Sequence, residues 1–231
     1  MNCIDRGYDL TYALSSNINA QISEYGEWLY DNIIIFDPTA EGMWELAVSN
    51  CTLTLIAFGG SSHKQLLDFV DAGHNLLIAV DSRVSDALRN LAQDCGISLE
   101  EPGTSMIDHF NFASGDDGDH TLIISRAVID APIIFANKKQ APILFRGIGM
   151  TLDEDSELLL PILSSSYSSF SSDTSDTPQS SNPPTAIGTK AVLVGALQAR
   201  NNARVVVSGS LELFSNEFFV ADADGYVAVH V

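Results

Sequence analysis

The hydrophobic positions of this chain fall into short continuous runs, separated by polar turns and by amphipathic segments. Continuous apolar runs of this length are typical of strands that are buried on both faces of a sheet. The polar stretch 198–203 separates the last two runs and predicts a tight connection. The runs that predict strands are 32–36, 75–80, 121–125, 132–136, 143–145, 191–197 and 204–208.

Two amphipathic segments predict helices, because their apolar residues recur at near-helical spacing. The first begins near residue 62 and ends before Gly73, since glycine is the usual residue just past a helix C-terminus. The second begins at Ser82 or Ser85, either of which can cap it, and ends before Gly96. Strands that alternate with helices predict an α/β domain with a mainly parallel sheet.

One segment breaks this alternation. Residues 164–185 are rich in Ser, Thr, Asp and Pro and contain almost no aliphatic side chain. Such a segment buries too little apolar surface to offset the entropy that ordering costs. We therefore predict a mobile loop here.

The charge of the chain excludes one class of function. The formal net charge is −19 at pH 7, so the surface repels the phosphates of nucleic acids and the anionic face of a membrane. No apolar run approaches the about 18 residues of a membrane helix, and the N-terminus lacks the pattern of a secretory signal. The sequence as it stands predicts no nucleic-acid partner and no membrane segment.

Carboxylates and imidazoles gather in one region, in Asp108-His109 and in Asp116-Asp117-Gly118-Asp119-His120. These groups are able to hold a divalent cation or to act as an acid/base pair. The spacing of a calcium loop is absent, however, and so is the His-Glu-x-x-His helix of zinc proteases. The pattern favours an acidic surface turn, and we predict no metal site.

Candidate nucleophiles are weak. A nucleophile elbow needs glycine two residues on each side, but Ser208 and Glu212 occupy those places around Ser210. Gly59-Gly60-Ser61-Ser62 lacks the spacing of a phosphate-binding loop and reads as a turn. Arg146 is better explained by an ion pair within the domain than by a ligand. We predict no catalytic residue and no cofactor.

An alternative stays open, namely an α/β hydrolase or amidotransferase-like enzyme that uses Ser210 or Cys95 with His109 or His120. A second alternative is a lumenal module that binds a glycan or a peptide.

The tract Leu197-Gln198-Ala199-Arg200-Asn201-Asn202-Ala203-Arg204-Val205, followed by Ser208-Gly209-Ser210, closely resembles the most recognisable part of the DDOST family. Arg6-Gly7-Tyr8-Asp9-Leu10-Thr11, Tyr25-Gly26-Glu27, Cys95-Gly96-Ile97, Ile107-Asp108-His109 and Pro142 to Gly147 match the same family in the same order. The resemblance covers about Arg6 to Phe219. Its signature residues, which we expect to be structural, are Gln198, Ala199, Arg200, Asn201, Asn202, Ala203, Arg204, Ser208, Gly209, Ser210, Arg146 and Gly147.

The resemblance implies a Rossmann-like α/β domain in the lumen of the endoplasmic reticulum, in a type I single-pass membrane protein. Members are non-catalytic subunits of oligosaccharyltransferase, the complex that transfers an oligosaccharide from dolichyl diphosphate to Asn of N-x-Ser/Thr sequons. The implied partners are the catalytic subunit, ribophorin-type subunits and small membrane subunits. The implied role is in assembly of the complex.

The chain departs from the family pattern at three places. Against that pattern it looks truncated at both ends, without the signal peptide, the first strand and the membrane helix. Residues 43–57 look like an insert, which contains the sequon at Asn50. We therefore predict one domain over 1–163 and 186–219, interrupted by the loop 164–185 and followed by a divergent tail, 220–231.

Overall fold

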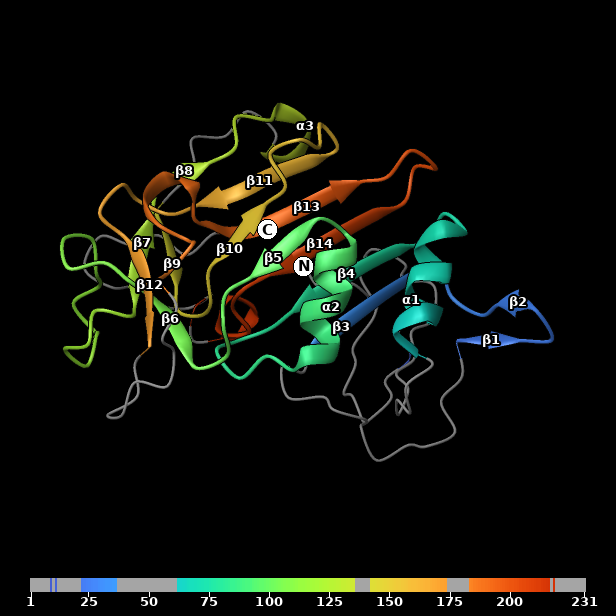
Figure 1. The fold of residues 1–231 in the computed structure, drawn as a ribbon, viewed down its shortest axis with the longest axis horizontal. Coiled ribbons are helices and arrows are strands. Elements are labelled where there is room, and N and C mark those ends of the chain that lie inside the picture. The colour runs from blue at the N-terminus through green and yellow to red at the C-terminus, as the bar shows by residue number, and fades with distance from the viewer. Residues whose placement is uncertain are drawn as a thin grey trace.

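A mixed β-sheet forms the centre of the structure, a computed structural model that describes residues 9, 11, 22–36, 62–135, 142–173, 183–216 and 218 (Figure 1). The sheet has eight strands, six of them in one continuous order. In that order they are β3 (Asn32–Phe36), β4 (Asn75–Ala79), β14 (Arg204–Ser208), β13 (Val192–Gln198), β10 (Met150–Leu152) and β5 (Ile97–Leu99). In addition, β11 (Leu159–Ser164) pairs with β13, and β8 (Ala127–Val128) pairs with β11.

The predicted fold class is wrong, because this sheet is not mainly parallel. Only β3–β4 and β4–β14 are parallel, whereas the other pairs of this sheet, from β14–β13 to β10–β5, are antiparallel. The described part of the chain therefore lacks the parallel sheet flanked by helices of a Rossmann-like fold. The physical reason is the short connection 199–203, since a parallel pair needs a crossover of a dozen or more residues.

Two helices cover one end of the sheet, and both were predicted. Helix α1 (Ser62–Asp71) ends before Gly73, and α2 (Asp86–Asp94) ends before Gly96. Both glycines have positive φ angles, +100° and +80°, which side chains other than glycine rarely adopt. The Ser85 hydroxyl accepts a hydrogen bond from Leu88 N–H and so caps α2. No described helix is long and apolar enough to cross a membrane.

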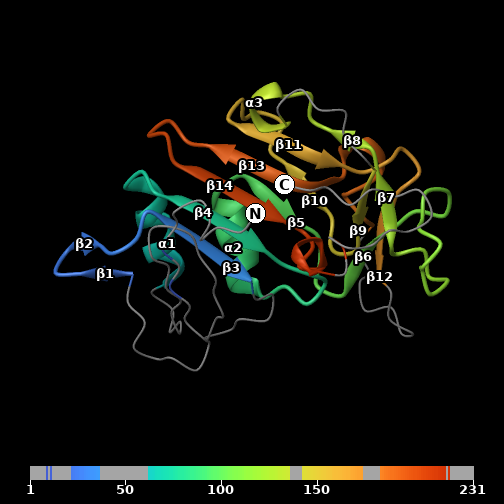
Figure 2. The ribbon, with the colours of Figure 1, turned by 180° about the vertical axis from the view of Figure 1, so that it is seen from behind.

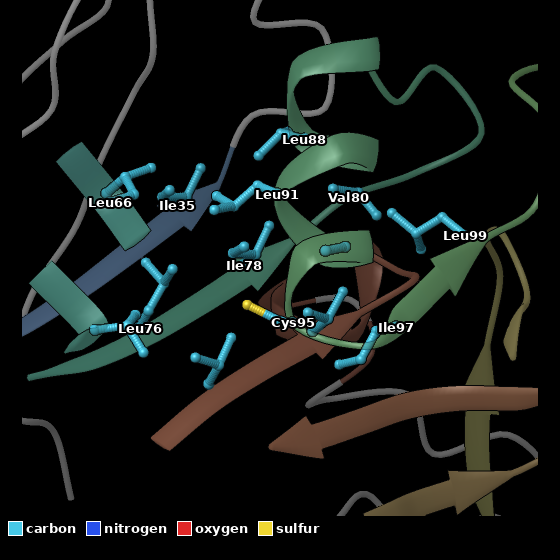
Figure 3. Packing of buried hydrophobic residues seen from close by; sticks show 14 of the residues in the cluster. Ile35, Leu66, Leu76, Ile78, Val80, Leu88, Leu91, Cys95, Ile97 and Leu99 are labelled. Atoms are coloured by element: carbon cyan, nitrogen blue, oxygen red, sulfur yellow. The ribbon is translucent and has the colours of Figure 1, made fainter. Parts of the chain in front are cut away.

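The main hydrophobic core lies between these helices and the sheet (Figure 3). Alternate residues of the central strands point to it, such as Ile35 of β3 and Ile78 of β4, and they meet Leu88 and Leu91 of α2. All four side chains are almost completely buried. Burial of each contributes about 1.5–3 kcal/mol, so this interface holds α2 on the sheet.

Two small antiparallel sheets lie at the other end of the molecule, as Figures 1 and 2 show from opposite sides, and a second hydrophobic core packs against them. It includes Met106, Ile123 and Phe145, which come from these two sheets. One of these sheets pairs β6 (Thr104–Ile107) with β12 (Phe170–Asp173), and the other pairs β7 (Ile123–Ser125) with β9 (Ile143–Phe145). A further pair, β1 (Ser23–Glu24) with β2 (Glu27–Trp28), lies at the opposite end, beside α1.

Two segments differ from their predicted structure. Pro132–Phe135, expected in a strand, forms the short helix α3, because proline is well suited to the first turn of a helix. Residues 170–173, within the segment expected to be a mobile loop, form β12, where Ser171 is buried. The described residues also include two 3-10 helices, η2 (Gly188–Lys190) and η3 (Glu212–Phe214). The predicted insert 43–57 and tail 220–231 lie outside the described residues.

Candidate functional site

The signature tract Gln198 to Arg204 forms the hairpin between β13 and β14. Gln198 pairs with Arg204, and Ala199 N–H donates to the carbonyl of Ala203 at 2.9 Å. Asn202 has a φ angle of +75°, a left-handed conformation that asparagine tolerates better than most residues. Ala203 is completely buried, so a larger side chain there has no room.

Asn201 joins this hairpin to helix α1. Its side-chain Nδ2 donates to the carbonyl oxygens of Val70 at 2.7 Å and Asp71 at 2.9 Å, and its Oδ1 accepts from Ala203 N–H at 3.0 Å. The last carbonyls of a helix have no partner within the helix. Asn201 therefore supplies the C-terminal cap of α1 from a distant part of the chain.

The start of β14 is fixed by a second set of polar contacts. Arg204 N–H donates to Asn75 Oδ1 at 3.0 Å, and Asn75 Nδ2 donates to Asn32 Oδ1 at 2.8 Å. Arg204 Nε also donates to Gln198 Oε1 at 3.1 Å. Arg200 is exposed and forms no hydrogen bond or ion pair with the described residues. Of the three charged signature residues, Arg146 and Arg204 thus have side-chain partners among the described residues, and Arg200 does not.

The remaining signature residues bring two backbone segments into close contact. Ile148 N–H donates to the carbonyl of Gly209 at 2.8 Å. A Cβ on Gly147 would lie 2.0 Å from Gly209 O, and one on Gly209 would lie 2.0 Å from Ile148 O. Only glycine fits at either position. Arg146 contributes an ion pair with Glu212, at 3.6 Å between Nη1 and Oε2.

The candidate nucleophiles do not meet a histidine among the described residues. Ser210 is completely buried, and its Oγ accepts a hydrogen bond from Leu213 N–H of η3 at 3.2 Å. Cys95 is buried in the main core, and this burial raises the pKa of its thiol to about 11. A thiol of that pKa carries almost no thiolate at neutral pH. The geometry gives the hydrolase or amidotransferase alternative no support.

In the acidic loop after β6, main-chain N–H groups of the loop donate hydrogen bonds to the carboxylate of Asp116. Asp116 accepts from the N–H groups of Gly118, His120 and Leu122, at 2.9, 2.7 and 2.9 Å. Burial raises the pKa of Asp116, but these hydrogen bonds outweigh it and leave the pKa below the ordinary value. His109 Nδ1 lies 2.6 Å from His120 Nδ1. No cluster of three metal-ligating residues exists among the described residues, and the hydrogen bonds of Asp116 form turns within this loop.

Asp108 ties this loop to the turn between β11 and β12. Its carboxylate is buried and accepts from Phe110 N–H at 2.9 Å, from Ser168 Oγ at 2.8 Å and from the hydroxyl of Ser166. Asn111 also donates to it, from both its main-chain and its side-chain nitrogen. Burial raises the pKa of Asp108, but the hydrogen bonds outweigh this effect and lower the pKa.

One open hollow of about 480 Å³ is lined by residues of β10, β11 and β13 and of the segments beside them. Its lining includes Thr151, Leu159 and Thr189, and the ion pair between Lys190 Nζ and Glu154 Oε1 (2.7 Å) lies at it. Both charged groups are largely exposed, so solvent screens the attraction between them. The hollow has room for a small polar molecule, but the charges of Lys190 and Glu154 are already paired with each other.

Comparison with known proteins decides the family. The family described as "OST48, N-terminal domain" matches residues 3–227. The chain belongs to this family. Proteins named "Dolichyl-diphosphooligosaccharide--protein glycosyltransferase 48 kDa subunit" are 39% identical over 218 residues in Danio rerio, 40% over 215 in Arabidopsis thaliana and 40% over 224 in Drosophila melanogaster.

These alignments cover 93%, 91% and 93% of this chain and 46%, 45% and 46% of the relatives. The OST48-family chain thus spans about half the length of the curated relatives it matches. Among solved structures, the mmIFT52 N-terminal domain resembles it with a TM-score of 0.51 and 12% identity, over 72% of this chain and 67% of that one. This likeness concerns the fold alone, and it agrees with the mixed sheet that replaces the predicted Rossmann-like arrangement.

Proposed function

We propose that this chain acts as a subunit of oligosaccharyltransferase in the endoplasmic reticulum and contributes to assembly of the complex. The observation that carries the proposal is the identity of 39–40% to relatives named as the 48 kDa subunit of that glycosyltransferase. The complex transfers a lipid-linked oligosaccharide from dolichyl diphosphate to Asn of N-x-Ser/Thr sequons. The proposed partners are a separate catalytic subunit, ribophorin-type subunits and small membrane subunits, with this domain on the lumenal side of a single-pass protein.

We assign the signature residues other than Arg200 to folding and not to chemistry. Asn201 caps a helix, Gly147 and Gly209 allow a close backbone approach, and Ser210 accepts a hydrogen bond from η3. None of these roles needs a substrate. Residues 186–219 are proposed to complete the same domain as residues 1–163, which the pairing of β14 with β4 supports.

Co-purification tests the proposal. The epitope-tagged chain is expressed in its own cells, membranes are solubilised in a mild detergent, and the captured proteins are identified by mass spectrometry. We expect the catalytic oligosaccharyltransferase subunit to be captured with the tagged chain and to be absent from an untagged control. Capture without that subunit, at expression levels near the natural one, overturns the proposal.

A further inference from the structure

A group of exposed apolar residues lies in the loop after β6 and in the segments on either side of β12, at the end of the molecule that Figure 1 shows opposite β1 and β2. We call it the aromatic surface and define it by Phe110, Phe112, Tyr167 and Ile187. Their exposed fractions are 80%, 38%, 81% and 52%. Single exposed apolar residues are ordinary, but several together on one part of a surface mark an interaction site.

Ring contacts and a β-bridge connect two residues of this surface, Phe112 and Ile187. Phe112 stacks on His120 with 4.1 Å between ring centroids, and His120 lies 4.9 Å from His109. His109 lies 5.8 Å from Phe170, which forms a β-bridge with Ile187. Phe112 and Ile187 are thus connected through His120, His109 and Phe170, while Phe110 and Tyr167 lie on backbone segments that Asp108 joins.

The buried carboxylate of Asp108 joins the two backbone segments that carry Phe110 and Tyr167. It accepts from the backbone of Phe110 and from the hydroxyls of Ser166 and Ser168, which flank Tyr167. The segments that carry Phe110 and Tyr167 are therefore both hydrogen-bonded to the side chain of Asp108. A surface that is ordered before binding loses less entropy on association.

The charge around the surface selects its partner. Residues 108–122 and 164–189 contain neither lysine nor arginine, and Asp117 and Asp119 are exposed in the loop that carries Phe110 and Phe112. An apolar centre with an acidic rim complements an apolar centre with a basic rim. A second copy of this chain, with the same acidic rim and a net charge of −19, is repelled, and so is an anionic lipid surface.

We propose that the aromatic surface is a docking site for another protein subunit, one that presents lysine or arginine side chains around an apolar patch. The inference deepens the proposed function and rests on it for the identity of the partner, which is another subunit of oligosaccharyltransferase. Phe110 and Tyr167 are the anchors, because large rings at the centre of an interface carry most of the binding energy.

Site-specific photo-crosslinking in the full tagged chain tests this assignment. The crosslinking amino acid p-benzoylphenylalanine replaces Phe110, Tyr167 or, as the control, Tyr25, which is 97% exposed at the opposite end of the molecule. We expect the same protein to be crosslinked from positions 110 and 167, on a peptide that carries basic residues, and that product to be missing from position 25. Products with lipid, with a second copy of the chain or with no protein overturn the assignment.

A matched pair of variants measures the strength of the contact. The double variant Phe110→Ala/Tyr167→Ala leaves every hydrogen bond to Asp108 in place, because these bonds involve main-chain N–H groups and neighbouring serines and asparagine. We expect recovery of the crosslinked protein to fall about tenfold or more, while Tyr25→Ala leaves it unchanged. Equal recovery from both variants overturns the docking site.

The outcomes separate this inference from the proposed function. If the catalytic subunit co-purifies but positions 110 and 167 yield no protein product, the docking site is wrong and the proposed function stands. If both positions yield one basic partner that is foreign to oligosaccharyltransferase, the surface docks a protein but the proposed function is wrong.

Discussion

Replacing Asn201 by alanine tests whether the signature hairpin is structural. The change removes two hydrogen bonds to the last carbonyls of α1 and one from the N–H of the buried Ala203. Water replaces the contact with the exposed Asp71 carbonyl, and the Val70 carbonyl keeps its hydrogen bond from Gly73 N–H, whereas Ala203 N–H loses its acceptor. We expect the free energy of unfolding to fall by about 1–2 kcal/mol and Tm to fall by about 2–8 °C in a chain of this length.

Two further variants test the structural role of Asn201. Arg200→Ala is the control, because Arg200 has no partner among the described residues, and we expect a change within about 0.5 kcal/mol. Asn201→Asp keeps the acceptor for Ala203 N–H but puts a negative charge at the negative end of the α1 dipole. We expect a loss of similar size that acid partly relieves. Thermal unfolding of the purified chain, followed by circular dichroism, measures all three, and equal Tm values for Asn201→Ala and Arg200→Ala refute the structural role.

Three more predictions concern the close backbone contact and the buried groups. Gly209→Ala should destabilise the fold by about 3 kcal/mol or more, since the new Cβ meets Ile148 O at 2.0 Å; an unchanged urea midpoint contradicts this. With the other two cysteines changed to serine, Cys95 should resist a thiol reagent at pH 8 until urea unfolds the chain, because burial raises its pKa to about 11; fast labelling of the native protein counts against this burial. Asp108→Asn should destabilise the fold at pH 7, and the difference from the unchanged chain should shrink as pH falls below about 4. The pKa of Asp108 is lowered in the folded state, so its stabilisation is present above the unfolded pKa and is lost as acid protonates it; a difference that stays constant from pH 7 to pH 3 refutes the argument.

Local sequence signals predicted the positions of strands and helices better than the way in which the strands pair. The strands over 32–36 and 204–208 and the helix ends at Gly73 and Gly96 lie where the apolar runs and glycines placed them. The prediction that neighbouring strands run mainly parallel was wrong. A continuous apolar run indicates burial on both faces of a sheet and carries no information on the direction of the neighbouring strand. The short connection 199–203 did carry that information, since it is too short for a parallel crossover.

The missed parts depend on contacts between distant residues. Strand β12 consists of Phe170, two serines and Asp173, a composition typical of loops, and it forms because its backbone pairs with β6. The role of Asp108 was missed for the same reason, since its hydroxyl donors lie 58 and 60 residues away. The expectation that Arg146 forms an internal ion pair is confirmed by its contact with Glu212, and the aromatic surface had no signal in the sequence beyond the residue types.

The position of β14 in the sheet affects how the chain folds during synthesis. This strand lies between β4 and β13, yet Val205 pairs with Leu76 across a long stretch of sequence. Until β14 leaves the ribosome, one edge of β4 has no partner, and at 5–20 residues per second this takes on the order of 6–25 s. An open apolar edge attracts other strands during that time. Protection of the β4 edge by a chaperone is therefore expected to matter more for the yield of this domain than its final stability does.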